Sequence, residues 1–342
     1  MASPDKFSPK KIIIRTPNWL GDLMMSTAFI NAVLTEFPEA DVDLIVKAGF
    51  ETIPLPHRGR IIPFDKRKES PVQFGKGLRD QEYDIFYVLP PSFSSALMAF
   101  SSKVSLRIGY TGSFRGFLLK PGIHFKKEHR SQHLVAEYLC LIDEQLELGE
   151  FYPELSISET WVEQNVSDIS ESLPQNFITI APGVIFGPAK QWPVSYFKEL
   201  VSSLRDKGEN IVVIGTNNDY ELGHFLSESD DGITNLCGET TLNQLIAVLS
   251  KSSLLVSNDS GTMHIMAALQ KPQVAIFGST STIWTSPVNK KADILTLEFE
   301  CSPCYNRKCR LGHTNCLNDL MPETVINAVN HILKDSDLQS VP

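Results

Sequence analysis

The stretch from residue 254 to residue 278 constrains the fold most, because two apolar runs flank a short polar turn. Residues 254–256 are predicted to form a buried strand, 258–261 a sharp turn, 263–269 a helix and 274–277 a second strand. Such a strand–helix–strand crossover places a helix start at the carboxyl end of a parallel strand, where ligands bind in open sheets. The helix start offers unpaired N–H groups and a positive dipole, which suit a phosphate group.

The residues of the turn fit either an ordinary capped helix or a ligand site. Asp259 or Ser260 could cap the helix, and Gly261 would let a ligand approach the backbone closely. His264 lies one turn further on and could bind a ligand or be a structural helix histidine. A capped strand–helix junction is common, so this stretch alone does not decide between the two interpretations.

Strands and helices alternate along the whole chain, which predicts parallel sheets covered by helices on both faces. The expected strands are 11–15, 41–46, 60–64, 83–89 and 105–109, then 177–180, 210–214, 233–236, 254–256 and 274–277. The expected helices are 22–37, 94–100 and 133–148, then 196–207, 220–227, 242–250 and 263–269. At 342 residues the chain exceeds the usual size of a single core. We therefore predict an α/β protein of two doubly wound domains, residues 1–155 and 177–342, joined by a linker at 156–176.

Composition and charge limit the classes of protein to consider. The chain is 42% hydrophobic and 21% charged with a net charge of −9, which is typical of a soluble protein and argues against nucleic-acid binding. Residues 103–130 depart from this balance, with seven lysines and arginines against one glutamate. They form either a solvated surface or a basic patch facing an anionic partner. Without an apolar segment that could span a bilayer or act as a signal peptide, the protein is expected in the cytoplasm.

Three motifs occur in a fixed order: Trp19-Leu-Gly-Asp-Leu-Met-Met25, Ala181-Pro-Gly-Val-Ile-Phe-Gly-Pro-Ala-Lys-Gln-Trp-Pro193 and Asn258-Asp-Ser-Gly-Thr-Met-His264. The ordered set resembles the bacterial lipopolysaccharide heptosyltransferases, most closely those of the second type, from about Lys11 to Lys334. The resemblance implies the GT-B fold of two facing Rossmann-like domains. It also implies that the N-terminal domain binds the acceptor and the C-terminal domain binds the nucleotide-sugar.

The activity that this resemblance implies is an inverting transfer of heptose from ADP-L-glycero-β-D-manno-heptose to the inner core of lipopolysaccharide. The donor is a substrate, and no cofactor or metal is expected. The lipid of the acceptor suggests loose peripheral contact with the inner face of the inner membrane. The Arg15 region and the Pro17-Asn18-Trp19 loop differ from those of the first heptosyltransferase type, which leaves the acceptor open.

Two residues are expected to carry the chemistry. Asp22 follows a strand and a loop at the first turn of a helix, where the dipole favours a carboxylate. It could simply cap the helix, or it could take the proton of the attacking hydroxyl as a general base. Lys190 ends a loop containing glycine and proline, where it could stabilise the departing diphosphate. The family's Gly-Asp pair and its lysine match Gly21-Asp22 and Lys190.

Further residues are expected to bind the two substrates, the donor-site assignments at 259–264 resting on the resemblance. Those expected to contact the nucleotide-sugar are Gly187, Thr216, Glu221, Thr240, Asp259, Ser260, Gly261 and His264. Acceptor binding is predicted for Arg15, Asn18, Arg58, Arg60, Arg107 and Arg115, because guanidinium groups grip carboxylates and phosphates bidentately. Solvation at the surface is the alternative for each of the last four arginines.

Four of the six cysteines lie close together in the sequence: Cys301, Cys304, Cys309 and Cys316, with His313 between the last two. This spacing could bind zinc or an iron–sulfur cluster, but it contains a single Cys-x2-Cys unit where zinc sites usually have two. The second heptosyltransferase type has a similar cysteine-rich stretch. We therefore expect reduced thiols in a packed loop, with a metal as the alternative.

Two other functions remain compatible with the sequence. One is a different two-domain nucleotide-sugar enzyme, with another sugar donor or an epimerase that needs no acceptor. The other is a metal-binding protein built around the cysteine cluster. An assay with donor alone tests the first, and metal analysis of the purified protein tests the second.

Overall fold

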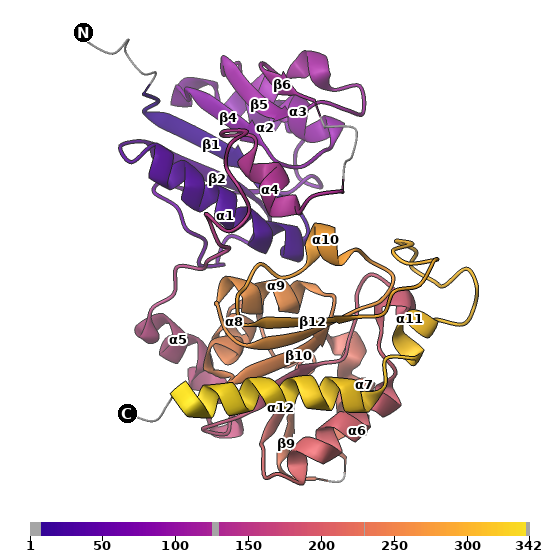
Figure 1. The fold of residues 1–342 in the computed structure, drawn as a ribbon. Helices are drawn as coiled ribbons and strands as arrows, with labels where there is room; N and C mark the ends of the chain where they lie inside the picture. The colour runs from indigo at the N-terminus through magenta and orange to yellow at the C-terminus, as the bar shows by residue number, and fades with distance from the viewer. Residues whose placement is uncertain (1–7, 125–129, 229, 340–342) are drawn as a thin grey trace. The chain divides into compact units, whose positions relative to one another are not determined.

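The computed structural model describes residues 8–124, 130–228 and 230–339, with side chains described up to Lys334. The chain divides into two compact units, one ending at Ser156 and the other beginning at Ile157 (Figure 1). Each unit contains its own parallel sheet and its own hydrophobic core. In the part of the chain that is described, no helix combines the length and apolar character needed to cross a bilayer.

Within the described residues, the first unit contains a sheet of six strands in the order β3-β2-β1-β4-β5-β6. Its strands are β1 (Lys11–Arg15), β2 (Asp41–Lys47), β3 (Ile61–Phe64), β4 (Ile85–Val88), β5 (Leu106–Tyr110) and β6 (Gly122–Ile123). All neighbouring pairs run parallel. The order reverses between β1 and β4, so the loops that follow these strands diverge and leave room for a ligand at their carboxyl ends.

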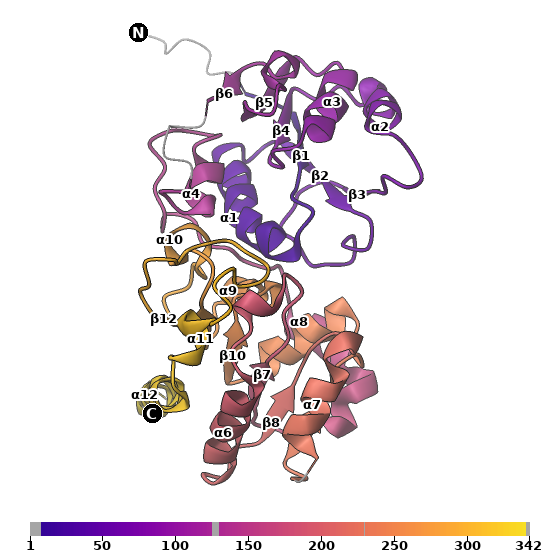
Figure 2. The same ribbon diagram turned by 90° about the vertical axis from the view of Figure 1, so that its right-hand side faces the viewer.

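Helices cover both faces of this sheet. They are α1 (Leu20–Glu36), α2 (Pro71–Gly77), α3 (Phe93–Ser101) and α4 (Leu134–Leu139), with short 3-10 helices η1 (Arg79–Gln81) and η2 (Gly116–Leu118). Figure 2 shows α1 and α4 on one face and α2 and α3 on the other. Alternate strand residues such as Ile13 and Phe86 pack with Phe74 and Met98 of α2 and α3. These strands are apolar along their length because helices bury both faces of the sheet.

The second unit repeats the same arrangement, with six strands among its described residues in the order β12-β11-β10-β7-β8-β9. They are β7 (Ile178–Ala181), β8 (Ile211–Val213), β9 (Ile233–Asn235), β10 (Leu254–Asn258), β11 (Gln273–Phe277) and β12 (Ala292–Thr296), all parallel. Here the order reverses between β7 and β10. The ligand-binding edge of this unit is therefore formed by the loops that follow these two strands.

The second unit is richer in helices than the first. They are α5 (Glu159–Val166), α6 (Val194–Arg205), α7 (Tyr220–Ser227), α8 (Leu242–Lys251), α9 (Gly261–Ala268), α10 (Thr282–Thr285), α11 (Asn315–Asn318) and α12 (Pro322–Gln339). The described residues of this unit also form the 3-10 helices η3 (Ser167–Ser172), η4 (Pro188–Lys190) and η5 (Asn217–Asp219). The core joins strand residues such as Ile180 and Val256 to Phe197 of α6 and Val329 of α12.

The predicted α/β class with two doubly wound sheets is confirmed, and most elements lie within two residues of their expected bounds. The helix expected over 133–148 is wrong in length, because α4 ends at Leu139. Beyond it the Asp143 carboxylate accepts the backbone N–H of Gln145 at 2.9 Å, a local turn that competes with a helix. The expected linker contains α5, which is tied to the second unit by a 2.6 Å ion pair between Glu163 and Lys251.

Candidate active site

A cation, a carboxylate and a hydroxyl meet at the carboxyl edge of the second sheet. The Nζ atom of Lys190 donates to Oδ2 of Asp259 at 2.5 Å, and the hydroxyl of Thr280 donates to the same oxygen at 2.5 Å. Lys190 comes from the loop after β7, Asp259 from the turn after β10 and Thr280 from the loop after β11. Asp259 and Thr280 are buried, and the Lys190 side chain is 14% exposed. The predicted Lys190 and Asp259 thus lie together at the point where the strand order reverses.

Asn258, the last residue of β10, fixes both ends of the loop that carries Lys190. Its side-chain amide donates to the carbonyl of Pro182 at 2.8 Å, and its oxygen accepts the backbone N–H of Trp192 at 2.9 Å. Trp192 is fully buried, and its indole donates to the carbonyl of Leu320 at 2.7 Å. Because Asn258 is itself buried, these bonds are shielded from water and hold the loop in one position.

The loop also depends on a glycine that no other residue could replace without strain. Gly187 has a φ of +151°, and a Cβ atom there would lie 2.5 Å from the carbonyl oxygen of Arg307. That same oxygen accepts the backbone N–H of Ala189 at 3.2 Å. Phe186 lies between two cations, with the Nζ of Lys190 at 4.9 Å and the guanidinium of Arg307 at 5.4 Å from its ring centre. The exposed Arg307 therefore adds a second positive charge beside Lys190.

The start of α9 differs from an ordinary capped helix. Ser260 occupies the N-cap position, but its side chain makes no capping bond, and its buried hydroxyl oxygen has no hydrogen-bond partner in the described chain. The Asp259 carboxylate, which was expected as an alternative cap, is turned to Lys190 and Thr280 instead. Gly261 begins the helix, and His264 is buried one turn further on. The first N–H groups of α9 therefore lack a side-chain cap within the described residues and suit an anion.

The remaining predicted donor residues lie along the same carboxyl edge. Thr216 follows β8, and both its backbone N–H and its hydroxyl bond to Asp219, at 2.8 and 2.7 Å. Glu221 is exposed in the first turn of α7. Thr240 lies one residue before Thr241, which caps α8. These residues share an edge with the Lys190–Asp259 pair, but within the described residues the side chain of Thr216 bonds to Asp219 and not to that pair.

At the carboxyl edge of the first sheet, Arg15 and Asp22 occupy the two ends of a short loop. Arg15 ends β1 and is buried, with its guanidinium donating to the carbonyl of Thr16 and to Oδ1 of Asn18, both at 2.5 Å. Burial lowers the pKa of Arg15 to about 10, so the group stays cationic at neutral pH. Its Nε atom has no partner among the described residues. A buried guanidinium with an unused donor beside the exposed Asn18 fits a role in holding an acceptor anion.

Asp22 is half-buried in the first turn of α1, whose N-terminus lacks a side-chain cap in the described structure. The positive end of the α1 dipole and the Asp22 carboxylate therefore lie at the same edge of the sheet. Tyr138 of α4 lies near it. Burial first, and then the negative charges of Asp22 and Glu137, raise the pKa of Tyr138 well above its usual value. Tyr138 thus stays a protonated phenol near the proposed base.

Arg115 is buried and holds two loops of the first unit together through hydrogen bonds. Its guanidinium donates to the carbonyls of Tyr110 at 2.8 Å, Pro90 at 2.5 Å and Ser92 at 3.0 Å, which joins the loops after β4 and β5. Burial lowers its pKa to about 10. One terminal nitrogen, Nη2, remains buried without a partner among the described residues. Arg115 therefore organises the loops at this edge and retains one unused donor there.

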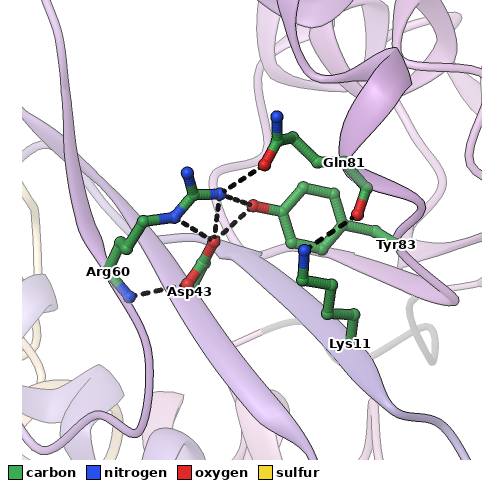
Figure 3. Close-up of polar contacts among 5 residues, drawn as sticks. All are labelled: Lys11, Asp43, Arg60, Gln81 and Tyr83. Atoms are coloured by element: carbon green, nitrogen blue, oxygen red, sulfur yellow. Dashed lines mark hydrogen bonds and ion pairs between the residues drawn. The ribbon is translucent and has the colours of Figure 1, made fainter.

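Arg58 and Arg60 do not lie with Asp22 at the carboxyl edge of the first sheet. Both precede β3, at the amino end of the sheet. Arg58 donates to carbonyls near the end of α1, including that of Leu34 at 3.3 Å. Arg60 forms an ion pair with Asp43 at 2.8 Å and also bonds to Tyr83 (Figure 3). The structure thus gives both residues structural contacts at the amino end of the sheet, and their acceptor-binding roles stay predictions.

Arg107, also predicted to bind the acceptor, is engaged by backbone carbonyls. Its guanidinium donates to Leu118 at 2.8 Å and to Val104, and it lies over the ring of Phe100. These contacts hold η2 against β5. Arg107 therefore supports the loop after β5 from a position near the amino end of its strand, and its acceptor-binding role likewise stays a prediction.

The four clustered cysteines line a common cavity of about 540 Å³ together with His313 and Glu300. All six cysteines of the chain are free thiols. Among the described residues, no three histidine, cysteine or acidic side chains are arranged so that they could hold a metal ion. The loop packs against the donor edge, since the N–H of Cys304 donates to the carbonyl of Ser279 at 3.0 Å. The cysteine-rich loop thus supports the segment that carries Thr280.

The sequence did not predict two residues at the donor edge, Thr280 and Arg307. Thr280 belongs to Gly278-Ser-Thr-Ser281, and small polar residues directly after a buried strand were a usable signal for it. Arg307 lies in the cysteine-rich loop, more than a hundred residues after Lys190. Its approach to Phe186 depends on tertiary packing that no local pattern encodes.

Comparison with known proteins agrees with this geometry. The family model described as "Glycosyltransferase family 9 (heptosyltransferase)" matches residues 72–315. The chain is 30% identical to lipopolysaccharide heptosyltransferase 2 of Escherichia coli K12, over 94% of this chain and 98% of that protein. It is 28% identical to lipooligosaccharide heptosyltransferase 2 of Campylobacter jejuni serotype O:2, over 96% and 100%. The solved structure of E. coli ADP-heptose lipopolysaccharide heptosyltransferase II superposes with a TM-score of 0.84 at 30% identity, covering 96% of this chain and 99% of that one.

Two parallel sheets with reversed strand order, each with polar groups at its carboxyl edge, define a glycosyltransferase of the GT-B class. The family match and the full-length relatives then specify which one. The chain belongs to glycosyltransferase family 9, the heptosyltransferases, and is an enzyme that transfers heptose.

Proposed function

We propose that the protein transfers heptose from ADP-L-glycero-β-D-manno-heptose to the inner core of lipopolysaccharide, with inversion at the anomeric carbon. Near-full-length relatives named as heptosyltransferase 2 support this choice of substrate class. The observation that carries the donor side is the Lys190–Asp259–Thr280 cluster beside the uncapped start of α9. A cation next to free helix N–H groups is suited to a diphosphate.

In the second unit, Lys190 and the amides of α9 neutralise charge as ADP leaves. Asp259 accepts one of the three N–H donors of Lys190, which fixes the direction of the ammonium group and leaves two donors for phosphate oxygens. Ser260 and His264 are the candidate contacts to the diphosphate or the sugar, and Thr216, Glu221 and Thr240 to the nucleotide. Because protein groups supply the positive charge, we expect turnover to persist in a metal chelator.

In the first unit, Asp22 acts as the general base. The acceptor hydroxyl oxygen attacks the anomeric carbon while its proton passes to the Asp22 carboxylate, and the bond between that carbon and the phosphate oxygen breaks. The leaving ADP keeps the electron pair of the broken bond. Arg15 and Asn18, at the start of the same loop, are placed to hold an anionic group of the acceptor.

The acceptor also determines where the enzyme works. Lipopolysaccharide inner core is built on a lipid, so we propose that the protein acts in the cytoplasm as a peripheral protein at the inner face of the inner membrane. The second unit then binds a soluble donor, and the first unit binds an acceptor that is attached to the membrane.

The test combines nucleotide choice with product formation. A thermal-shift series with ADP, UDP and GDP should show the largest stabilisation with ADP, because ligand binding to the folded state raises the melting temperature. Incubation of ADP-heptose with a core acceptor that carries one heptose should release ADP and add one heptose to the product mass. Release of ADP without a heptosylated product, or preference for UDP, would contradict the proposal.

A further inference from the structure

Four phenylalanine side chains are exposed on one part of the first unit. The exposed fractions are 43% for Phe93, 48% for Phe100, 95% for Phe114 and 74% for Phe117. Large exposed apolar groups that gather in one place usually mark an interaction site, whereas single ones carry no meaning. Ser113 and Phe114 both have positive φ angles, at 47° and 57°. This backbone conformation is disfavoured for a bulky residue, and here it accompanies a phenyl ring that is almost fully in solvent.

Contacts between the neighbouring segments show that these rings form one surface. The rings of Phe93 and Phe117 lie 6.4 Å apart, which joins α3 to η2. The guanidinium of Arg107 lies 5.5 Å from the ring centre of Phe100 and donates to the carbonyl of Leu118, next to Phe117. Arg115 follows Phe114 directly and bonds to the carbonyl of Ser92, next to Phe93. Two segments, α3 with Phe93 and Phe100 and residues 114–118 with Phe114 and Phe117, therefore present their phenyl groups on neighbouring parts of the first unit.

The same surface carries positive charge in a chain that is otherwise acidic. Lys120 pairs with Arg107 through two backbone hydrogen bonds, and the exposed Lys103 follows the helix that bears Phe93 and Phe100. The net charge of the chain is −9, yet residues 103–130 contain seven basic residues and one acidic residue. Two of the seven, Lys126 and Lys127, lie outside the described residues. We call the group Phe93, Phe100, Phe114, Phe117, Lys103 and Lys120 the aromatic–basic surface.

Its position relates it to the acceptor side of the reaction. Phe93 begins α3, the helix that follows β4, and Phe114 lies in the loop after β5, so both lie at the carboxyl edge of the first sheet. Asp22 follows β1, the strand that pairs with β4, at the same edge. An occupant of the aromatic–basic surface would therefore sit beside the edge to which the acceptor sugar is assigned.

We propose that the aromatic–basic surface docks the protein on an anionic lipid bilayer, an inference that rests on the proposed function only for the identity of the acceptor. Phenyl rings enter the boundary between headgroups and acyl chains, while lysines beside them pair with negatively charged headgroups. Apolar insertion and basic charge together give the two signals that stable yet reversible membrane binding requires. The charge of the surface complements anionic lipid and repels an identical patch on a second copy of the chain.

The experiment measures co-sedimentation of the full-length protein with vesicles, without any substrate. Vesicles of phosphatidylethanolamine with phosphatidylglycerol are compared with vesicles of phosphatidylcholine alone. The test variant is Phe114→Ser with Phe117→Ser. Phe225→Ser is the control, because Phe225 is a phenylalanine that is 43% exposed and lies on α7 in the other unit. A second variant, Lys103→Gln with Lys120→Gln, tests the charge.

We expect wild type and Phe225→Ser to bind anionic vesicles and to bind neutral ones weakly. The double phenylalanine variant should lose about tenfold or more in partitioning. Each lysine removed should cost about fivefold, and the remaining binding should weaken as salt is raised. Equal binding of all variants, or equal binding to neutral vesicles, overturns the proposal. A dimer in the wild type that the phenylalanine variant abolishes would also overturn it, because the surface would then be an interface between copies.

A soluble core oligosaccharide without lipid separates this inference from the proposed function. The double phenylalanine variant should transfer heptose to that acceptor at the wild-type rate while losing rate on acceptor embedded in vesicles. An equal loss on both acceptors would show that the phenylalanines contact the sugar, which contradicts membrane docking. Vesicle binding without any transfer would instead remove the proposed function and leave the docking surface intact.

Discussion

The ammonium group of Lys190 and the carboxylate of Asp259 lie 2.5 Å apart although their residues are 69 positions apart in the sequence. The pair joins the loops after β7 and β10, which are neighbours in the sheet because the strand order reverses between them. Asp259 is further held by Thr280. The arrangement keeps the lysine in one orientation before the donor arrives, so little reorganisation is needed when negative charge develops on the leaving group.

Replacing Lys190 with alanine should lower kcat/KM by about 10²- to 10³-fold, the range found when one preorganised charge-stabilising donor is removed. Asp259 would then be left buried without its cation, so thermal stability should be measured alongside activity. Lys251→Ala is the control, because Lys251 pairs with the exposed Glu163 away from the donor edge. Steady-state kinetics for both variants check the expectation, and near-normal kcat/KM in Lys190→Ala would contradict it.

Replacing Asp22 with asparagine should reduce kcat by at least about 10²-fold, since general base catalysis contributes about 10²- to 10⁴-fold. Binding of ADP, measured by calorimetry, should stay within about twofold of wild type because the proposed donor contacts belong to the other unit. Asp41→Asn, at an exposed position that begins β2, provides the control. Full turnover in the Asp22 variant would remove the general-base role.

Replacing Gly187 with alanine should weaken ADP binding at least about tenfold, because the new Cβ would meet the carbonyl oxygen of Arg307 at 2.5 Å and displace the Lys190 loop. Gly208→Ala is a matched control: its φ is also positive, at +85°, but nothing lies within 4 Å of the added atom. That control should lose about 1–2 kcal/mol of stability and keep ADP affinity. Equal ADP affinity in both variants would contradict a role for the loop in donor binding.

Replacing Asp43 with asparagine should make the free energy of unfolding depend less on pH in the acid range. Burial alone would raise the pKa of Asp43, but hydrogen bonds from Tyr83 and Arg60 outweigh burial and lower it. A lowered pKa in the folded state stabilises the protein above the unfolded pKa of about 4, and this contribution is lost as pH falls through the folded value. At pH 7 the variant should lose about 1–3 kcal/mol, mainly from hydrogen bonds, because the Arg60 side chain is 55% exposed.

Urea unfolding of both proteins between pH 3 and pH 7 measures this difference. The stability that Asp43→Asn loses relative to wild type should stay constant above about pH 5 and shrink below about pH 4. Asp65→Asn removes a pair between residues two positions apart, in which the Arg67 side chain is 83% exposed, and should change stability at pH 7 less than Asp43→Asn does. If the free energy of unfolding differs between wild type and Asp43→Asn by the same amount at every pH, the carboxylate charge plays no part in stability.

Cys309 should be the first thiol to react with iodoacetamide near neutral pH. The backbone N–H of Thr314, with those of Leu311, Gly312 and His313, lowers its pKa, although burial opposes this. Burial raises the pKa of Cys237 to about 12, so Cys237 should react last. Because the thiolate is the nucleophile, the order of alkylation follows these pKa values. Mass spectrometry of peptides after short exposures measures the order, and faster labelling of Cys237 would contradict it.

The sequence predicted the strands well because their apolar runs, such as residues 11–15 and 254–258, are buried on both faces by helices. It missed β6 and β12, which lie at sheet edges and are short or only partly buried. It also missed α12, whose exposed face is polar and whose core contact depends on α6. Edge elements owe their structure to their neighbours, and local pattern carries little of that information.

The position of a candidate site residue was predictable where a polar residue directly follows a buried strand, as Asp259 follows β10. The arginines were assigned to acceptor binding from their charge alone. Arg58 and Arg60 come just before β3, and in a parallel sheet that position is the amino edge. Arg115 looked like an exposed cation but is buried under three carbonyl groups, which a charge pattern cannot reveal.

The bond network of Asp43, Arg60 and Tyr83 fastens β2 to the segments before β3 and β4 at the edge away from the chemistry (Figure 3). Such a division lets the acceptor-facing loops change in length and composition without unfolding the sheet that carries them. Divergence toward new acceptor sugars can therefore proceed on this half of the molecule while its architecture persists.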